Sequence, residues 1–248
     1  MNGTAKDRLA IALDASDRET LLALARELGP EAGVLKIGLE AFVSLGPGFV
    51  SEMTSAGARV FLDLKLHDIP NTVGGAAAAA ARTGATILNV HASGGLDMMR
   101  AAGERARAAA AAAGLAVPRV IAVTVLTSLD AAMLARVGLS GTPREAAVRL
   151  AALAREAGLD GVVCSPEEIE AIRAACGPDF LLVVPGIRPE GSAAGDQKRL
   201  ATPAGAIASG ADLLVVGRPI TTAADRVAAA RAIVREIASG LAAASLRL

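Results

Sequence analysis

The chain has 248 residues, and its 25 basic and 25 acidic side chains give a formal net charge of zero. With no Trp, no Tyr and no basic run, it lacks the features of a nucleic-acid-binding protein. Its length suits a single α/β barrel domain spanning residues 1–248. The apolar run near the N-terminus is too short for a signal peptide or a membrane span. Cys164 and Cys176 match no metal or disulfide spacing, so we expect a reducing, cytoplasmic setting.

Short apolar runs alternate along the chain with longer amphipathic segments. The runs predict strands at residues 8–13, 33–38, 59–65, 86–92, 119–126, 161–165, 180–186 and 212–218. The segments between them predict helices, among them 17–28, 142–158, 165–176 and 221–239, and alanine-rich stretches add further helices. Eight strands, each followed by a helix, indicate a (β/α)₈ TIM barrel. The main alternative is an open doubly wound sheet, which favours a glycine-rich turn after the first strand, whereas the turn here is LDASDRE.

Polar side chains gather where the predicted strands end, which is where barrel enzymes place their active sites. They come from seven strands and comprise Asp14, Lys36, Asp63, Lys65, Asp68, His91, Thr127, Arg188, Gly217 and Arg218. A structural ion-pair network would explain two or three of these residues. It does not readily explain all of them at one end of the barrel.

Lysine is rare in this chain: four of the 25 cationic residues are Lys and the rest are Arg. Because Lys can release a proton and Arg cannot, Lys36 and Lys65 at strand ends indicate proton chemistry. Asp63 and Lys65 are two residues apart, so a regular strand would point both to one face. With Lys36 and Asp68 they would form an alternating charge array that keeps each Lys protonated. The alternative is a buried salt-bridge cluster, which contributes little to stability.

A second group of residues has the features of a phosphate site, which barrels often build from the loops after strands 7 and 8. The segment VVGRPI offers the Gly217 backbone N–H and the Arg218 guanidinium, and Pro219 suits a first helical turn. The long loop 186–199 carries Arg188 and Gln197 and is of a length typical of lids. A plain surface loop with scattered arginines is the alternative.

Neither histidine is expected to be catalytic. His67 should point away from Lys65, and a lone His91 at a strand end is more often structural. We expect no metal site, because no His, Cys and carboxylate set has metal-ligand spacing and the lysines would repel a cation.

The stretch DLKLHDIPNT resembles the third-strand signature of the orotidine 5′-phosphate decarboxylase family in its bacterial form. The resemblance extends over nearly the whole chain, through LKIGLE, NVHASGG, VTVLTS, VVPGIRPEG, GDQKR and LLVVGRPI. It implies a (β/α)₈ barrel that forms a homodimer with active sites at the subunit interface. It also implies conversion of orotidine 5′-phosphate to UMP and CO₂, the last step of de novo pyrimidine synthesis, without metal or organic cofactor.

The resemblance also implies a role for each matching residue. Lys65 would protonate C6 of the pyrimidine, and Asp63 would lie near the departing carboxylate and help to position Lys65. Lys36 and Asp68 would join them in the catalytic charge network. Asp68 would do so, with Thr72, by reaching into the site of the partner subunit. The substrate would be bound as follows: the ribose by Asp14 and Lys36, the pyrimidine by Thr127, and the phosphate or its lid by Arg188, Gln197, Gly217 and Arg218.

Two other functions remain open at this point. The first is a related phosphosugar enzyme, such as 3-keto-L-gulonate 6-phosphate decarboxylase or hexulose-phosphate synthase, which share D-x-K-x-x-D but use a metal. The segments IPNT, VTVLTS and GIRPEG favour the pyrimidine enzyme. The second is a non-catalytic phosphosugar-binding barrel, which would be expected to lack part of the charged array.

Overall fold

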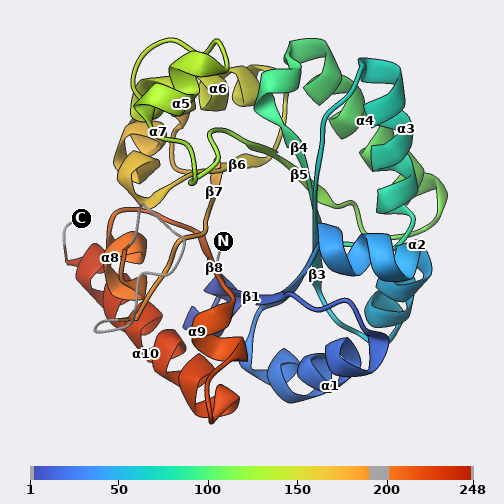
Figure 1. Ribbon diagram of the computed structural model, residues 1–248, viewed down its shortest axis with the longest axis vertical. Helices are drawn as coiled ribbons and strands as arrows, with labels where there is room; N and C mark the ends of the chain where they lie inside the picture. The colour runs from blue at the N-terminus through green and yellow to red at the C-terminus, as the bar shows by residue number, and fades with distance from the viewer. Residues whose placement is uncertain (1–2, 190–200, 247–248) are drawn as a thin grey trace.

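The computed structural model describes residues 3–189 and 201–246, and its eight strands form a closed parallel barrel (Figure 1). Each strand pairs with the next in the chain, and the eighth pairs with the first. The strands are β1 (Leu9–Leu13), β2 (Val34–Gly38), β3 (Val60–Leu66), β4 (Ile87–His91), β5 (Arg119–Val123), β6 (Gly161–Val163), β7 (Leu181–Val184) and β8 (Leu213–Val216). All eight begin and end within three residues of the predicted bounds. The closed order confirms the TIM barrel and excludes the doubly wound sheet.

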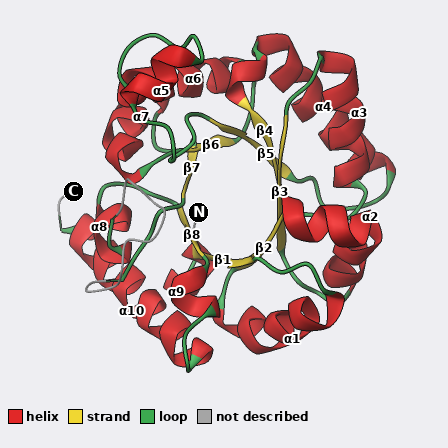
Figure 2. Cartoon of the chain, in the orientation of Figure 1, coloured by secondary structure: helices red, strands yellow, loops and turns green. Residues whose placement is uncertain are grey.

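The helices form a ring around the strands (Figure 2). They are α1 (Arg18–Leu28), α2 (Leu39–Ser55), α3 (Pro70–Ala81), α4 (Leu96–Ala112), α5 (Ala131–Arg136), α6 (Pro143–Glu156), α7 (Ile169–Cys176), α8 (Pro203–Ala208), α9 (Arg218–Thr221) and α10 (Arg226–Ser245). Short 3₁₀ helices lie at Ala5–Arg8, Gly29–Glu31, Ala92–Gly94 and Pro166–Glu168. Within the described residues, we find no helix with both the length and the apolar character that a bilayer crossing needs.

Side-chain caps set several helix starts. Asp17 accepts a hydrogen bond from the Thr20 backbone N–H, and Thr142 accepts one from the backbone N–H of Glu145. Such caps satisfy N–H groups that have no partner inside the helix. The same device explains why the predicted helix 221–239 was wrong as a single helix: Asp225 caps a new helix, α10, and the short α9 precedes it.

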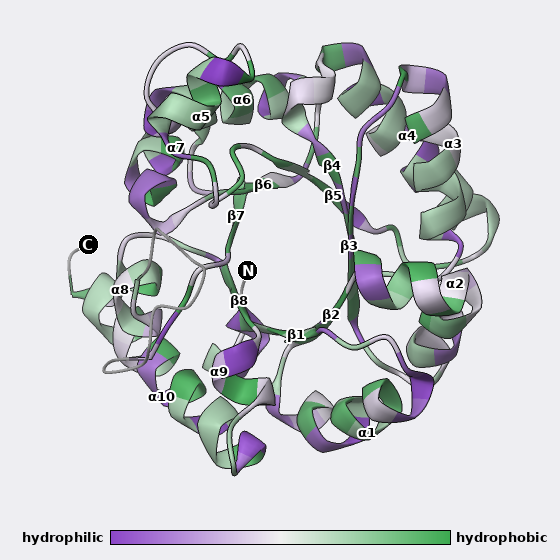
Figure 3. Cartoon of the chain, viewed as in Figure 1, coloured by the Kyte–Doolittle hydropathy of each residue, from purple (hydrophilic) through white to green (hydrophobic). Residues whose placement is uncertain are grey.

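Apolar side chains pack against both faces of the barrel wall, in two separate layers. The larger one lies between the barrel wall and the helices, and the strands appear mostly as hydrophobic in Figure 3. The smaller one fills the barrel interior and comprises Ala10, Val34, Phe61, Ile87, Ile121, Leu181, Val183 and Leu213. Strands buried on both faces account for the continuously apolar runs in the sequence.

The N-terminal end of the barrel is closed by a pair of similar polar clamps. Asp160, just before β6, accepts hydrogen bonds from the backbone N–H of Val120 on β5 at 2.7 Å and from an arginine of α4 at 3.3 Å. Asp212, just before β8, accepts from the backbone N–H of Leu182 on β7 at 2.9 Å and from Arg173 at 2.6 Å. Each clamp ties two adjacent strands to the helix layer.

The opposite end of the interior is polar. Two residues beyond the buried Val34, Phe61 and Ile87, the same faces of β2, β3 and β4 carry Lys36, Asp63 and Asn89. The barrel thus places ionisable and amide groups directly above its apolar interior, at the ends of the strands.

Candidate active site

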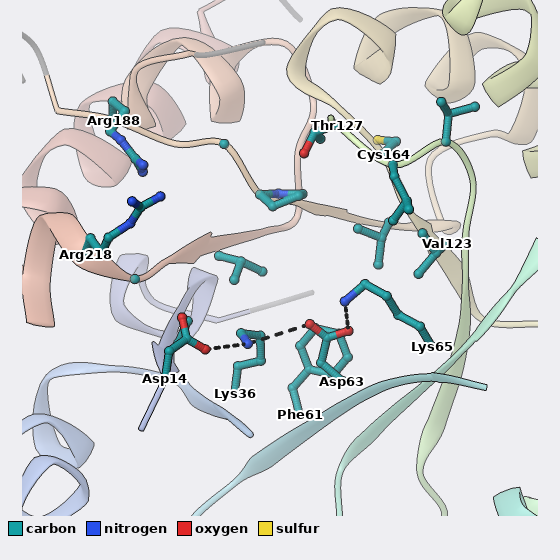
Figure 4. A pocket seen from close by; sticks show the side chains of 18 residues that line it. Asp14, Lys36, Phe61, Asp63, Lys65, Val123, Thr127, Cys164, Arg188 and Arg218 are labelled. Atoms are coloured by element: carbon teal, nitrogen blue, oxygen red, sulfur yellow. Dashed lines mark hydrogen bonds and ion pairs between the residues drawn. The ribbon is translucent and has the colours of Figure 1, made fainter. Parts of the chain in front are cut away.

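A cavity of about 250 Å³ opens at the C-terminal ends of the strands (Figure 4). Eight of the residues predicted from the sequence line it: Asp14, Lys36, Asp63, Lys65, Thr127, Arg188, Gly217 and Arg218. They come from loops and strand ends that are far apart in the chain. The closed barrel is what brings them together.

Charges of alternating sign form a row along one wall of the cavity (Figure 4). The Lys36 ammonium lies 3.2 Å from an Asp14 carboxylate oxygen and 3.7 Å from Asp63 Oδ2. The Lys65 ammonium lies 2.6 Å from Asp63 Oδ1. Lys36 is 8 % exposed and is held between two carboxylates, whereas Lys65 is the more accessible ammonium. The row can therefore present a positioned proton donor to a bound molecule.

The Asp63 carboxylate is ionised in spite of its burial. Burial is the largest single influence on its pKa and acts to raise it. The charges of Lys65 and Lys36 and the hydrogen bonds from Lys65 and Asn89 act in the opposite direction, and together they hold the pKa of Asp63 below its ordinary value. A fixed negative charge therefore lies next to the Lys65 ammonium at neutral pH.

Lys65 contacts Asp63 as predicted, but β3 is not the regular strand that the prediction assumed. Leu62 pairs with Leu88 and Leu66 with Val90, so β3 holds two more residues than β4 across this interval. Lys65 adopts a left-handed φ of 51° there. A regular strand has neither feature, so Lys65 contacts Asp63 from within a bulge.

Asn89 is a site residue that the sequence reasoning missed. It is 1 % exposed, its Nδ2 donates to Asp63 Oδ1 at 2.6 Å, and its Oδ1 accepts from the Lys65 backbone N–H at 2.8 Å. A signal was available in the sequence, because Asn89 is the polar residue within the apolar run ILNV and shares the face of Ile87.

Two arginines lie side by side across the cavity from the lysines (Figure 4). Arg188 follows β7 and Arg218 begins α9. Burial, and next the charge of Arg218, lower the pKa of the Arg188 guanidinium. Two like charges held close together favour binding of an anion between them.

Three predicted site residues lie elsewhere. Asp68 and Thr72 are exposed on the rim beyond β3, and the Asp68 carboxylate accepts a hydrogen bond from the Ile69 backbone N–H at 2.6 Å. Neither lines the cavity of this chain. Gln197, with most of the predicted lid, lies outside the described residues.

The two histidines lie against each other beside the cavity, with ring centroids 5.4 Å apart. Burial, and next the neighbouring His67 and Lys65, lower the pKa of His91. Cys164, expected in the core, is buried but also lines the cavity. No group of three or more His, Cys, Asp or Glu side chains that could hold a metal occurs in residues 3–189 and 201–246.

Comparisons with known proteins show the family of this chain. A sequence model described as "Orotidine 5′-phosphate decarboxylase / HUMPS family" matches residues 7–233. The orotidine 5′-phosphate decarboxylase of Moorella thermoacetica is 55 % identical over 94 % of this chain and 93 % of its own length, and that of Anaeromyxobacter dehalogenans is 56 % identical over 92 % and 96 %.

A solved structure is also similar. The crystal structure of orotidine 5′-phosphate decarboxylase from Lactobacillus acidophilus superposes with a TM-score of 0.82 at 39 % identity and covers 92 % of this chain and 98 % of that one. The match in sequence, over nearly the full length, and the match in fold lead to the same conclusion. The chain belongs to the orotidine 5′-phosphate decarboxylase / HUMPS family.

Proposed function

We propose that this protein decarboxylates orotidine 5′-phosphate to UMP and CO₂, the last step of de novo pyrimidine synthesis, without a metal or organic cofactor. One observation carries the proposal: a single cavity has the Asp63–Lys65 pair on one wall and two arginines on the other (Figure 4). A nucleotide with a carboxylate at one end and a phosphate at the other matches both walls.

In the proposed reaction, the negative charge that develops on C6 lies next to the Lys65 ammonium, and the substrate carboxylate lies next to Asp63. The bond between C6 and the carboxyl carbon breaks, CO₂ leaves, and the electron pair stays on C6. The Lys65 ammonium, 2.6 Å from Asp63 and accessible from the cavity, then transfers a proton to C6 and regains one from solvent. Preorganised charges of this kind stabilise a developing carbanion without reorganisation during the step. Asp63, ionised beside the departing carboxylate, disfavours the bound substrate relative to the transition state.

Arg188, Gly217 and Arg218 bind the phosphate in this proposal, and Gln197 completes the lid. Binding energy from a group remote from the reacting carbon can be used to order the site around the substrate. Thr127 lies on the cavity wall near the pyrimidine, and Asp14 and Lys36 bind the ribose hydroxyls.

The proposal includes a homodimer in which Asp68 and Thr72 complete the site of the partner subunit. Three large apolar side chains support an interface on this rim: Leu39 is 51 % exposed, Val43 79 % and Ile69 66 %. Ile69 directly follows Asp68, so an interface that covers this apolar side chain would carry the Asp68 carboxylate into it. The free, buried thiols of Cys164 and Cys176 fit the proposed cytoplasmic setting.

The test is loss of the orotate absorbance when purified protein is mixed with orotidine 5′-phosphate, with UMP identified as product. We expect turnover that excess EDTA leaves unchanged, and its complete loss in Lys65→Ala. Lys6→Ala, which removes another of the four lysines from the far end of the barrel, should keep full activity. Folded protein without turnover, or turnover abolished by EDTA, would instead favour a metal-dependent phosphosugar reaction.

A further inference from the structure

The β3 bulge leaves the Lys65 backbone without a regular ladder partner on β4. Between the pairs Leu62–Leu88 and Leu66–Val90, one residue of β4, Asn89, stands opposite three residues of β3. Backbone N–H groups that lie away from water need a partner, and this stretch cannot obtain one from the usual strand pairing. The partner that the structure gives the Lys65 N–H is a side chain.

The Asn89 side chain supplies it with an amide, the same chemical group as a peptide bond. Its Oδ1 accepts from the Lys65 N–H at 2.8 Å, in place of a backbone carbonyl. Its Nδ2 donates to Asp63 Oδ1 at 2.6 Å, on the same oxygen that receives the Lys65 ammonium at 2.6 Å. Asn89 thus contacts both members of the charged pair, one through its carboxylate and the other through its backbone.

We infer that Asn89 is a positioning residue for the reaction, which orients Asp63 and holds the Lys65 backbone in its left-handed conformation. The inference rests on the proposed function. Lys65 is the non-glycine residue with positive φ in the described part of the chain, a conformation that L side chains disfavour. Without the bond to Asn89, the backbone is free to relax and carry the ammonium away from C6.

An amide is the side chain that fits both contacts. An Asp at position 89 would accept from the Lys65 N–H but would place a second carboxylate against Asp63. A Leu of similar size would make neither bond and would remove the partner of the part-buried Lys65 N–H. Asn89→Asp therefore removes only the favourable contact with Asp63, whereas Asn89→Leu removes the contacts with both Asp63 and Lys65.

The expected effect is on the chemical step. A displacement of about 1 Å at a reacting group can reduce the rate by about 10²-fold. We expect Asn89→Leu to lower kcat about 100-fold and to change KM by less than about threefold, because the phosphate contacts lie on the opposite wall. Asn89→Asp should lower kcat at least as much.

The pH dependence separates positioning from general structural damage. The Asn89 hydrogen bond adds to the lysine charges that lower the pKa of Asp63 against its burial, so losing it should raise that pKa. The acidic limb of the kcat/KM profile should therefore move to higher pH in Asn89→Leu, and further in Asn89→Asp. A ¹³C titration of the Asp63 carboxyl should show the same shift without any need for turnover.

Thr83→Val is the matched control. Thr83 is also buried and polar, precedes the opposite end of β4, and donates to the Ala80 carbonyl at 2.6 Å. It should keep wild-type kcat and the wild-type acidic limb. If Asn89→Leu does not fold, Asn89→Asp and Asn89→Ser carry the same measurements.

Failure of the proposed decarboxylation and failure of the positioning role of Asn89 would give different results. Wild-type protein that does not act on orotidine 5′-phosphate removes the proposed function, and the Asp63 titration still tests the contact. Active wild type, with a folded Asn89 variant whose kcat stays within twofold and whose acidic limb does not move, overturns the positioning role.

Discussion

The backbone conformation of Lys65 makes a quantitative prediction about two inactive variants. At most positions Gly is less stable than Ala by about 0.5–1 kcal/mol, because the unfolded glycine chain has more freedom to lose. At φ of 51° an Ala side chain instead costs about 1–2 kcal/mol that Gly avoids. The difference between the two terms favours Lys65→Gly over Lys65→Ala by about 0–1.5 kcal/mol. Both variants lose the same ammonium, so the comparison isolates the backbone term.

Lys36 provides the matched control on the adjacent strand. It pairs regularly with Ala12 and Phe61, its φ is not positive, and its ammonium also contacts Asp63. There, Lys36→Ala should be more stable than Lys36→Gly by about 0.5–1 kcal/mol, so the sign of the difference is reversed between the two positions.

Urea denaturation at one protein concentration would measure both differences, because stability of an oligomer depends on concentration. A difference of 1 kcal/mol corresponds to about 2–4 °C in Tm for a domain of this size, so thermal unfolding gives a second reading. If Lys65→Ala proves more stable than Lys65→Gly by the margin seen at Lys36, the left-handed conformation at position 65 is refuted, and with it the strain that we assign to the site.

Three further outcomes are expected. Lys65→Ala and Asp68→Ala should each be inactive alone, and mixed dimers should recover part of the activity because one of the two sites then has both groups. No recovery in verified heterodimers would argue against shared sites. Arg218→Ala should mainly raise KM and weaken inhibition by inorganic phosphate, and unchanged kinetics would remove Arg218 from the site. The lowered pKa of Asp63 contributes stability that is complete above its ordinary value of 3.8 and is lost as the pH falls through the lower folded value. Asp63→Asn should therefore lose less stability than wild type over that acidic range, as measured by urea unfolding, and an equal loss would contradict this sign.

The barrel itself could be predicted from the sequence because strands buried on both faces have an unmistakable pattern. Runs such as LLVV at β7 and β8 are apolar at every position, and the helices between them are long enough to be read separately. The one helix that was predicted wrongly, 221–239, contained a readable cap in Asp225, but the alanine-rich segment around it conceals the break.

The site was harder to predict where it departs from regular geometry. The strand VFLDLKL alternates as any strand would, and nothing in those letters indicates the extra residues that bulge against β4. Asn89 was missed for a related reason. The other polar site residues lie at or beyond strand ends or in the loops that follow them, whereas this amide lies within β4 and contacts the Lys65 backbone only because β3 bulges opposite it.

The two aspartate clamps at the N-terminal end of the barrel have a consequence for how such a protein can change over evolutionary time. They repeat the same arrangement on β5–β6 and on β7–β8, using residues that contribute nothing to the cavity. The clamps thereby anchor the four strands β5 to β8 at the N-terminal end of the barrel, which is opposite to the cavity. Loops at the other end are free to be lengthened, exchanged or recruited for a new phosphorylated substrate while the scaffold persists, so that one inherited framework can diversify into enzymes of several specificities.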